Sequence, residues 1–297
     1  MIPQKIKLIQ ADGKIPNLAL MKISAYHKQR GDTVAWDTPD PDKVYISCIF
    51  SKNAGKVRGI AKMFPCDVDI GGSGVDLKKT LPQEIEEMKP DYDLYPSSFS
   101  QGYTTRGCIR SCGFCIVRQK EGKIRPAQHP STFHDARFET CMIMDNNLLA
   151  ADQEWQDSVF AWFIKTKTKM ISPQGWDIRL ITKENAATLR SIKHVWPIHF
   201  AWDNVAEEDQ IMAGIGILKD AGFDLRHKGL IYVLAGYNTT IQEDLYRVRK
   251  LKEAGCTPYL MRYLKSTDLN RIARWVNIPQ LFWSMDISEY TRRGIPK

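Results

Sequence analysis

Short apolar runs alternate with polar and amphipathic stretches along residues 1–90. Runs rich in valine and isoleucine, bounded by glycine, proline or aspartate, have the composition and length of β-strands. Stretches whose apolar residues recur three and four positions apart have the spacing of amphipathic helices. Strands are expected at residues 6–12, 32–37, 43–51 and 66–72, and helices at 17–31 and 54–65. This order predicts a small open α/β domain of the Rossmann-like kind over residues 1–90.

The rest of the chain, residues 91–297, repeats a strand-then-helix order. Strands are expected at residues 98–107, 139–147, the start of 169–181, 197–204, 225–238 and 257–264. Helices are expected at residues 153–167, 184–194, 207–222, 240–255 and 267–277. Repeated βα units of this length predict a parallel sheet curved into a partial (β/α)6 barrel of the TIM type, followed by a C-terminal extension.

Polar residues follow several of these expected strands. They are Asp145–Asn147, Asp177–Arg179, Asp203 and Tyr237–Asn238. In βα architectures the active site lies at the carboxyl ends of the strands. We therefore expect these side chains to lie near one another at one edge of the barrel.

The net charge is +8, from 42 basic and 34 acidic residues. Between Arg106 and Arg125 the chain has six basic residues and one acidic residue, Glu121. Such a balance suits an anionic partner such as a nucleic acid or a nucleotide, and equally a lysine-rich solvated surface. Both interpretations stay open from charge alone.

No apolar run approaches the roughly 20 residues that span a bilayer, so we expect no membrane insertion. The first ten residues, MIPQKIKLIQ, lack the apolar core of a secretory signal. We therefore expect a cytoplasmic protein in a reducing compartment. There, an odd set of seven cysteines favours metal or redox chemistry over a disulfide framework.

Three cysteines are crowded into the stretch RGCIRSCGFCIV, at Cys108, Cys112 and Cys115. A structural zinc site takes four ligands, and no fourth cysteine or histidine follows at the spacing of a zinc finger. An iron–sulfur cluster normally takes four thiolates. A cluster held by three thiolates keeps one iron open to a small molecule.

The C-x3-C-x2-C spacing, with Phe114 just before the third cysteine, resembles the signature of the radical S-adenosylmethionine superfamily. The resemblance implies a [4Fe–4S] cluster on Cys108, Cys112 and Cys115, with S-adenosylmethionine chelated to the fourth iron. It implies reductive cleavage to methionine and a 5′-deoxyadenosyl radical, which abstracts hydrogen from a substrate. It also implies an oxygen-sensitive enzyme with an external electron donor such as flavodoxin or ferredoxin. Arg106 and Arg110 are placed in sequence to tune the cluster.

Further stretches resemble the superfamily over residues 95–265. MDNN stands where many members have a glycine-rich segment ending in an acid, and VLAGYN resembles the fifth-strand motif. The resemblance implies contacts to S-adenosylmethionine from Phe114, Asp145, Asn146, Asn147, Arg179, Asp203, Gly236 and Tyr237. In it, the MDNN residues meet the amino group, Arg179 the carboxylate, Asp203 a ribose hydroxyl and Gly236 the adenine. Each polar residue is also a candidate helix cap or turn residue.

The N-terminal domain resembles the cobalamin-binding domains of some superfamily members. The D-x-H-x-x-G signature is missing, because Ala25 and Arg30 flank His27 where the acid and the glycine would stand. We expect a scaffold domain without cobalamin. The glycine-rich GGSG at residues 71–74 is a candidate phosphate cradle or a plain loop.

Two other functions stay open at this point. One is a non-catalytic iron–sulfur or zinc protein that binds nucleic acid. The other is a cobalamin-dependent radical S-adenosylmethionine methylase. The sequence leaves the substrate itself unassigned, with nucleic acid or a nucleotide weakly favoured by the net charge.

Overall fold

The computed structural model describes residues 2–290, which fall into two compact units. Of these residues, 2–111 and 115–142 form the first unit, and 112–114 and 143–290 form the second. Both units contain parallel strands and helices, so the chain has the mixed α/β class predicted from the sequence. The predicted domain boundary at residue 90 stays a prediction. The part of the predicted C-terminal extension after residue 290 lies outside the described residues.

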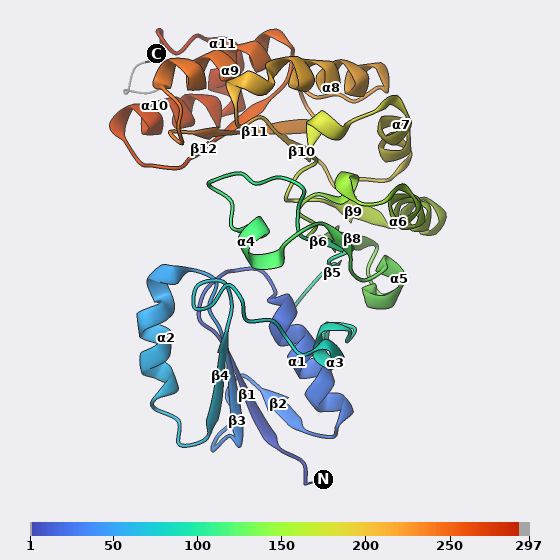
Figure 1. The fold of residues 1–297 in the computed structure, drawn as a ribbon, viewed down its shortest axis with the longest axis vertical. Helices are drawn as coiled ribbons and strands as arrows, with labels where there is room; N and C mark the ends of the chain where they lie inside the picture. The colour runs from blue at the N-terminus through green and yellow to red at the C-terminus, as the bar shows by residue number, and fades with distance from the viewer. Residues whose placement is uncertain (1, 291–297) are drawn as a thin grey trace. The chain divides into compact units, whose positions relative to one another are not determined.

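The first unit is built on a four-stranded parallel sheet with the order β2-β1-β3-β4 (Figure 1). Its strands are β1 (Lys5–Gln10), β2 (Thr33–Ala35), β3 (Lys43–Ser47) and β4 (Asp67–Gly71). Its main helices are α1 (Leu18–Gln29) and α2 (Ala54–Ala61). These elements confirm the strands and helices predicted for residues 6–72.

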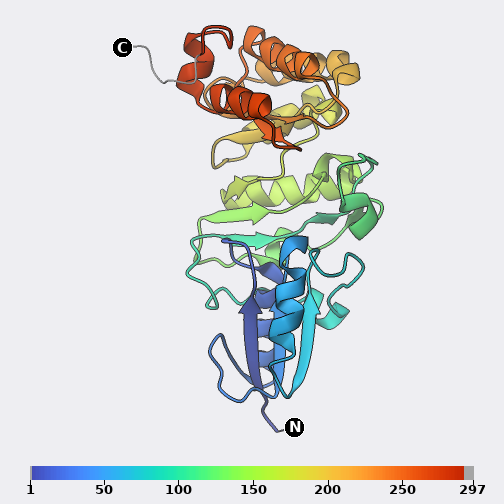
Figure 2. The ribbon, with the colours of Figure 1, turned by 90° about the vertical axis from the view of Figure 1, so that its left-hand side faces the viewer.

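The two helices cover opposite faces of this sheet, and Figure 2 views it from the side of α2. On the α1 face, Leu20 packs in a buried cluster with Ile6 and Leu8. On the α2 face, Val57 packs with Val44 in a second cluster. The alternation along β1 and β3 therefore supplies two cores, as expected for strands buried on both faces.

The first unit continues into short elements around the cysteines. They are α3 (Gln83–Glu86), β5 (Ser100–Gly102), β6 (Thr105–Arg106), α4 (Val117–Glu121), β7 (Arg125–Pro126), α5 (Pro130–Phe133) and β8 (Thr140–Ile143). One strand was expected over residues 98–107, but the chain breaks it into β5 and β6. The break arises because β6 turns away to pair antiparallel with β7, with Arg106 opposite Arg125.

The second unit contains a three-stranded parallel sheet with the order β10-β11-β12. These strands are β10 (Ile198–Ala201), β11 (Gly229–Ala235) and β12 (Pro258–Arg262), and the unit also contains β9 (Lys169–Ile171), which is not part of this sheet. Its helices are α6 (Gln153–Thr166), α7 (Lys183–Ser191), α8 (Glu208–Asp220), α9 (Ile241–Glu253), α10 (Thr267–Val276) and α11 (Pro279–Ser284). Isolated parallel bridges join Met170 to His194 and Trp176 to Phe200, beside β9 and β10.

One face of the sheet β10-β11-β12 carries the core of the second unit. Along β11, Ile231 and Val233 are fully buried, whereas the alternating Tyr232 is only half-buried. Helices α8 to α11 lie on the same side of these strands in Figure 1. Trp275 and Phe282 are also fully buried, so these C-terminal aromatic residues belong to the core.

Within residues 2–290, every helix is too short or too polar to cross a lipid bilayer.

Candidate functional site

The three clustered cysteines lie in the loop between β6 and α4. Cys108 and Cys112 are half-buried, Cys115 is exposed, and none of the seven cysteines of the chain forms a disulfide bond. Among residues 2–290, no three cysteine, histidine or acidic side chains are arranged as a ready metal site. Thiolates repel one another without a cation, so metal binding itself commonly gathers such ligands.

Cys108 forms hydrogen bonds through its backbone nitrogen, its carbonyl oxygen and its sulfur. The N–H of Cys108 donates to the carbonyl of Gly122 at 3.3 Å, and Arg118 donates to the carbonyl of Cys108 at 2.9 Å. The N–H of Arg110 donates to the Cys108 sulfur at 3.3 Å. Backbone N–H groups aimed at sulfur are one of the means by which proteins stabilise thiolates and tune iron–sulfur clusters.

A network of charges supports the start of this loop. Glu121 accepts a hydrogen bond from the N–H of Gly107 at 2.9 Å. Arg106 forms ion pairs with Glu121 at 3.2 Å and with Glu86 at 2.7 Å. Lys22, which is 2% exposed, pairs with Glu86 at 3.4 Å. The expected role of Arg106 in tuning a cluster stays a prediction. In the structure, Arg106 pairs with these two carboxylates and holds the start of the loop.

Burial and pairing compete within that network. Burial alone would raise the pKa of Glu86, but Lys22 and Arg106 outweigh it and lower this pKa. Burial lowers the pKa of Lys22 despite its contact with Glu86. A buried charge without a partner is costly, so these ion pairs are expected to stay formed. They fix the position of the segment before Cys108.

In the second unit, the residues that follow the strands meet in a hydrogen-bonded group. Arg179 donates to both oxygens of Asp177, at 2.6 and 3.1 Å, and also pairs with Glu207. Asn147, which follows β8, donates to Asp177 at 3.2 Å. Burial alone would lower the pKa of Arg179, but Asp177 and Glu207 outweigh it and raise this pKa. The guanidinium is therefore occupied by two carboxylates.

Asp203 lies beside this group, after β10. It accepts from the N–H of Leu234 at 3.1 Å, and burial raises its pKa against the opposing effects of Leu234, Arg247 and Arg179. Around these strand ends, Asp145, Asp177, Asp203, Glu207 and Asp244 are acidic, and Arg179 and Arg247 are basic. Five carboxylates against two guanidinium groups make this edge attractive to a cationic ligand.

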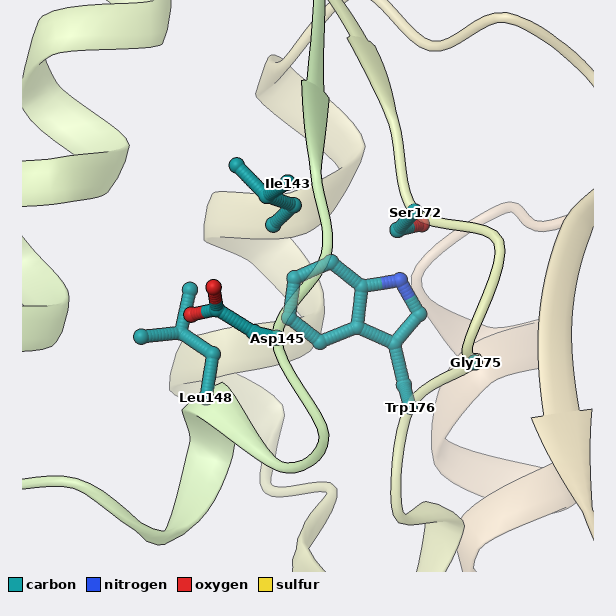
Figure 3. A pocket seen from close by; sticks show the side chains of 6 residues that line it. All are labelled: Ile143, Asp145, Leu148, Ser172, Gly175 and Trp176. Atoms are coloured by element: carbon teal, nitrogen blue, oxygen red, sulfur yellow. The ribbon is translucent and has the colours of Figure 1, made fainter. Parts of the chain in front are cut away.

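A small pocket lies at the ends of β8 and β9 (Figure 3). It is lined by Ile143, Asp145, Leu148, Ser172, Gly175 and Trp176. The Trp176 ring lies between Asp145 and Ser172, with its indole nitrogen towards Ser172 (Figure 3). That nitrogen is buried and has no hydrogen-bond partner among the described residues. A buried, unsatisfied donor is unusual, so the pocket offers a hydrogen bond to a small acceptor.

The turn after β11 presents Gly236 and Tyr237. Gly236 has a φ of 77°, which favours glycine, and its N–H donates to Asp244 at 3.1 Å. Asp244 pairs with Arg247 at 2.6 Å, and both side chains are fully buried. Thr239 also donates to Asp244, at 2.8 Å. The buried ion pair of Asp244 and Arg247 therefore fixes the position of the turn at Gly236.

Tyr237 contacts the part of the cysteine loop that belongs to the second unit. Its ring meets Phe114 edge-on at 5.3 Å and Tyr263 at 4.7 Å. A Cβ atom on Gly113 would overlap the Tyr237 hydroxyl, so the two are in close contact. This contact places the segment next to Cys112 at the carboxyl ends of β11 and β12.

Some residues of this site were not predicted from the sequence. Glu207, Trp176, Tyr263 and Asp244 were not assigned, although Glu207 and Asp244 lie in or just before the first turn of a helix that follows a strand. Asn146 is half-buried, and its predicted contact to the amino group stays a prediction. The structure brings Asn147, Arg179 and Asp203 together, whereas Phe114 and Tyr237 form a second group.

In the first unit, His27 is 5% exposed and both of its ring nitrogens have partners, Asp32 at 2.7 Å and Tyr45 at 3.0 Å. It would have to break these contacts to bind a metal. Comparison with known proteins adds no assignment: no protein-family model matches the chain, and no curated protein is significantly similar to it. The resemblance to radical S-adenosylmethionine enzymes therefore rests on the residues themselves.

Proposed function

We propose that this protein is a radical S-adenosylmethionine enzyme in which Cys108, Cys112 and Cys115 hold a [4Fe–4S] cluster. The observation that carries the proposal is the C-x3-C-x2-C spacing, in a loop where a backbone N–H already points at the Cys108 sulfur. When bound, such a cluster supplies the electron that divides S-adenosylmethionine into methionine and a 5′-deoxyadenosyl radical. Three thiolates leave one iron for S-adenosylmethionine.

The strand ends of the second unit support S-adenosylmethionine as the cosubstrate. This molecule carries a sulfonium and an ammonium, and the acidic excess formed by Asp145, Asp177, Asp203 and Glu207 attracts both. Arg179 would bind that molecule's carboxylate only after exchanging Asp177 or Glu207 for it, so we assign Arg179 to holding the acidic residues in place.

The finer architecture is part of the same proposal. Strands β9 to β12 alternate with helices, and β10, β11 and β12 pair in parallel in chain order. We assign the strands of residues 91–297 to a partial (β/α)6 barrel. We further assign the enzyme to the cytoplasm, with an external reductant such as flavodoxin or ferredoxin, and the N-terminal domain to a scaffold without cobalamin.

The first test is anaerobic reconstitution with iron and sulfide, followed by dithionite, S-adenosylmethionine and chromatography of 5′-deoxyadenosine. We expect wild type to bind about four irons per chain and to form 5′-deoxyadenosine. Cys112→Ala should lose both. Cys66→Ala is the matched control, because Cys66 is a half-buried thiol outside the loop, and it should retain both. Zinc in place of iron, or iron-loaded protein that fails to bind S-adenosylmethionine, would contradict the proposal.

A further inference from the structure

Two apolar side chains are exposed beside the cysteines of the first unit. Ile109 directly follows Cys108 and is 43% exposed, and Ile116 directly follows Cys115 and is 47% exposed. Cys115 itself is exposed. The N–H of Cys108 donates to the carbonyl of Gly122, so the two ends of this segment meet and both isoleucines belong to one loop. An apolar surface therefore borders the exposed thiol.

Basic side chains are fixed around this loop. Three of them donate to main-chain carbonyls: Arg118 to Cys108 at 2.9 Å, Arg125 to Glu121 at 2.6 Å and Lys78 to Gln119 at 2.7 Å. A carbonyl carries no net charge, so these bonds place the side chains at the loop and at α4 without neutralising them. The exposed Lys123 adds a fourth cation, and its backbone packs against Gly107, just before Cys108.

The carboxylates of the same region offset little of this charge. Glu121 is the one acidic residue between Arg106 and Arg125, its side chain is 9% exposed, and it pairs with Arg106. Asp76 is exposed and accepts from the N–H of Lys78 at 2.8 Å, so it offsets one cation. The surface stays positive. We call it the Cys115 face, and its members are Ile109, Cys115, Ile116, Lys78, Arg118, Lys123 and Arg125.

The composition of the Cys115 face favours a protein partner. Apolar side chains inside a polar or charged rim are the usual arrangement of a protein–protein interface, and a positive rim selects an acidic partner. Single-stranded nucleic acid binds instead by stacking its bases on exposed aromatic rings. The exposed apolar residues here are isoleucines, and the ring of the neighbouring Phe114 is half-buried and packed edge-on against Tyr237.

The exposure of Cys115 indicates what such a partner delivers. Under the proposed function, the cluster receives an electron from outside the chain. Electron transfer slows steeply with distance, so the donor must approach the ligand that reaches the surface. Cys108 and Cys112 are half-buried, whereas Cys115 is exposed between the two isoleucines and the cations. The shortest route from solvent to the three thiols therefore passes through the Cys115 face.

We propose that the Cys115 face docks an acidic electron-carrier protein, which passes its electron to the cluster beside Cys115. This inference rests on the proposed function. The carrier is oxidised by one electron and the cluster is reduced by the same electron, and no bond forms or breaks. Ile109 and Ile116 pack on the carrier, while Lys78, Arg118, Lys123 and Arg125 meet its carboxylates.

The test compares two sources of electrons in the reconstituted full-length protein. One is a pre-reduced flavodoxin of strongly negative net charge, below its saturating concentration, and the other is dithionite. We expect Ile116→Ser and Lys123→Glu each to lower the flavodoxin-driven rate of 5′-deoxyadenosine formation about tenfold. Dithionite is small and needs no docking surface, so its rate should stay at the wild-type value in both variants.

Lys62→Glu is the matched control. Lys62 is exposed and ends α2, at the amino-terminal edge of the same unit's sheet, so it reverses the same charge away from the cysteines. Both of its rates should equal those of wild type. Raised salt should slow the flavodoxin-driven reaction of wild type and have a smaller effect in Lys123→Glu, because that variant lacks one of the screened charges.

Direct binding provides a readout that needs no turnover. Surface plasmon resonance measures the Kd of the flavodoxin for the full-length protein, with and without reconstituted iron. Ile116→Ser and Lys123→Glu should each raise Kd about tenfold, and Lys62→Glu should leave it unchanged. Wild-type Kd and rate in both face variants would overturn the proposal, as would an equal loss in Lys62→Glu. Anionic vesicles or an oligonucleotide that bind through Ile116 and Lys123 in place of the flavodoxin would also overturn it.

The two proposals fail separately. Protein that forms 5′-deoxyadenosine with dithionite, but whose flavodoxin-driven rate and flavodoxin Kd ignore both face variants, overturns the Cys115 face and leaves the proposed function standing. Protein that forms no 5′-deoxyadenosine with dithionite and fails to bind S-adenosylmethionine overturns the proposed function. If its flavodoxin Kd still responds to Ile116→Ser and Lys123→Glu, the Cys115 face is retained as a docking surface for an acidic protein.

Discussion

The carboxyl ends of the parallel strands differ between the two units. Asp12, shortly after β1, accepts from the N–H groups of Ile49 and Phe50 at 2.7 and 3.0 Å. Asp203, after β10, accepts from the N–H of Leu234 at 3.1 Å. Burial alone would raise the pKa of Asp12, but its hydrogen bonds outweigh this and lower it. Burial raises the pKa of Asp203 despite its hydrogen bond.

The strand ends of the two units differ in how the surrounding chain satisfies their carboxylates. In the first unit the loops satisfy one another, since Asn53 also donates to Asp12 at 2.9 Å and the N–H of Gly74 donates to Cys48 at 3.0 Å. In the second unit, Asp177 and Glu207 are held by Arg179, whereas burial raises the pKa of Asp203. Carboxyl groups whose pKa is raised by burial are typical of binding and catalytic sites.

Loss of the buried ion pair between Asp244 and Arg247, in the second unit, should have the largest effect on the free energy of unfolding. Asp244→Ala leaves the fully buried Arg247 without the carboxylate that pairs with it, although its bonds to the carbonyls of Trp202 and Leu234 remain, and it removes the bond from the N–H of Gly236. We expect a loss of about 3–5 kcal/mol in the free energy of unfolding, measured by urea denaturation. Arg249→Ala, which breaks the exposed pair with Asp286, is the control and should cost less than about 1 kcal/mol. Equal losses would show that the turn does not depend on the buried pair.

A change in the glycine loop of the first unit should have a smaller effect. Gly72 has a φ of 107°, and a Cβ there would overlap the carbonyl of Cys48. Gly72→Ala should therefore lower the free energy of unfolding by about 1–3 kcal/mol. Gly71→Ala is the matched control, because no atom lies within 4 Å of its added Cβ. If the two variants melt alike, the loop is not the close-packed scaffold that the comparison describes. The candidate phosphate cradle at 71–74 is, in this structure, packed against residues 48–50, which follow β3.

The smallest effects should depend on pH, and they should have opposite signs at the two edges. The lowered pKa of Asp12 stabilises the fold above its unfolded pKa, and this contribution is lost as the pH falls through the folded pKa. Asp12→Ala should therefore cost about 1 kcal/mol at pH 7 and less towards pH 3. The raised pKa of Asp203 destabilises the fold as the pH rises above its ordinary value. Asp203→Asn should therefore be more stable than wild type at pH 7, with a smaller gain near pH 4.

Urea denaturation at several pH values checks both variants against wild type, so that groups common to all three proteins cancel. If the change in the free energy of unfolding relative to wild type varies with pH in the same way for both variants, the two edges do not differ in this respect. A larger cost for Asp203→Asn than for Asp12→Ala at pH 7 would reverse it.

Local pattern predicted most of the elements. The alternation in β11 and the amphipathic spacing of α9 both appear where the sequence places them, because each depends on a face that must be buried. The strand expected over residues 98–107 was wrong in one respect, since pairing of β6 with β7 breaks it. The short α3 and α4 were missed, because helices of 4 and 5 residues have too few positions to show a period.

Sequence alone determined the strand and helix order, the carboxylates that end the strands and the three cysteines at their spacing. These follow from local periodicity and from the identity of the residues. Only the tertiary structure decided that Arg179 is occupied by Asp177 and Glu207, and that Tyr237 lies over Gly113. Such contacts join residues up to 124 positions apart, as in Gly113 and Tyr237, and depend on how the strands register and pack. No local pattern encodes that register, because it is set by the burial of many side chains together.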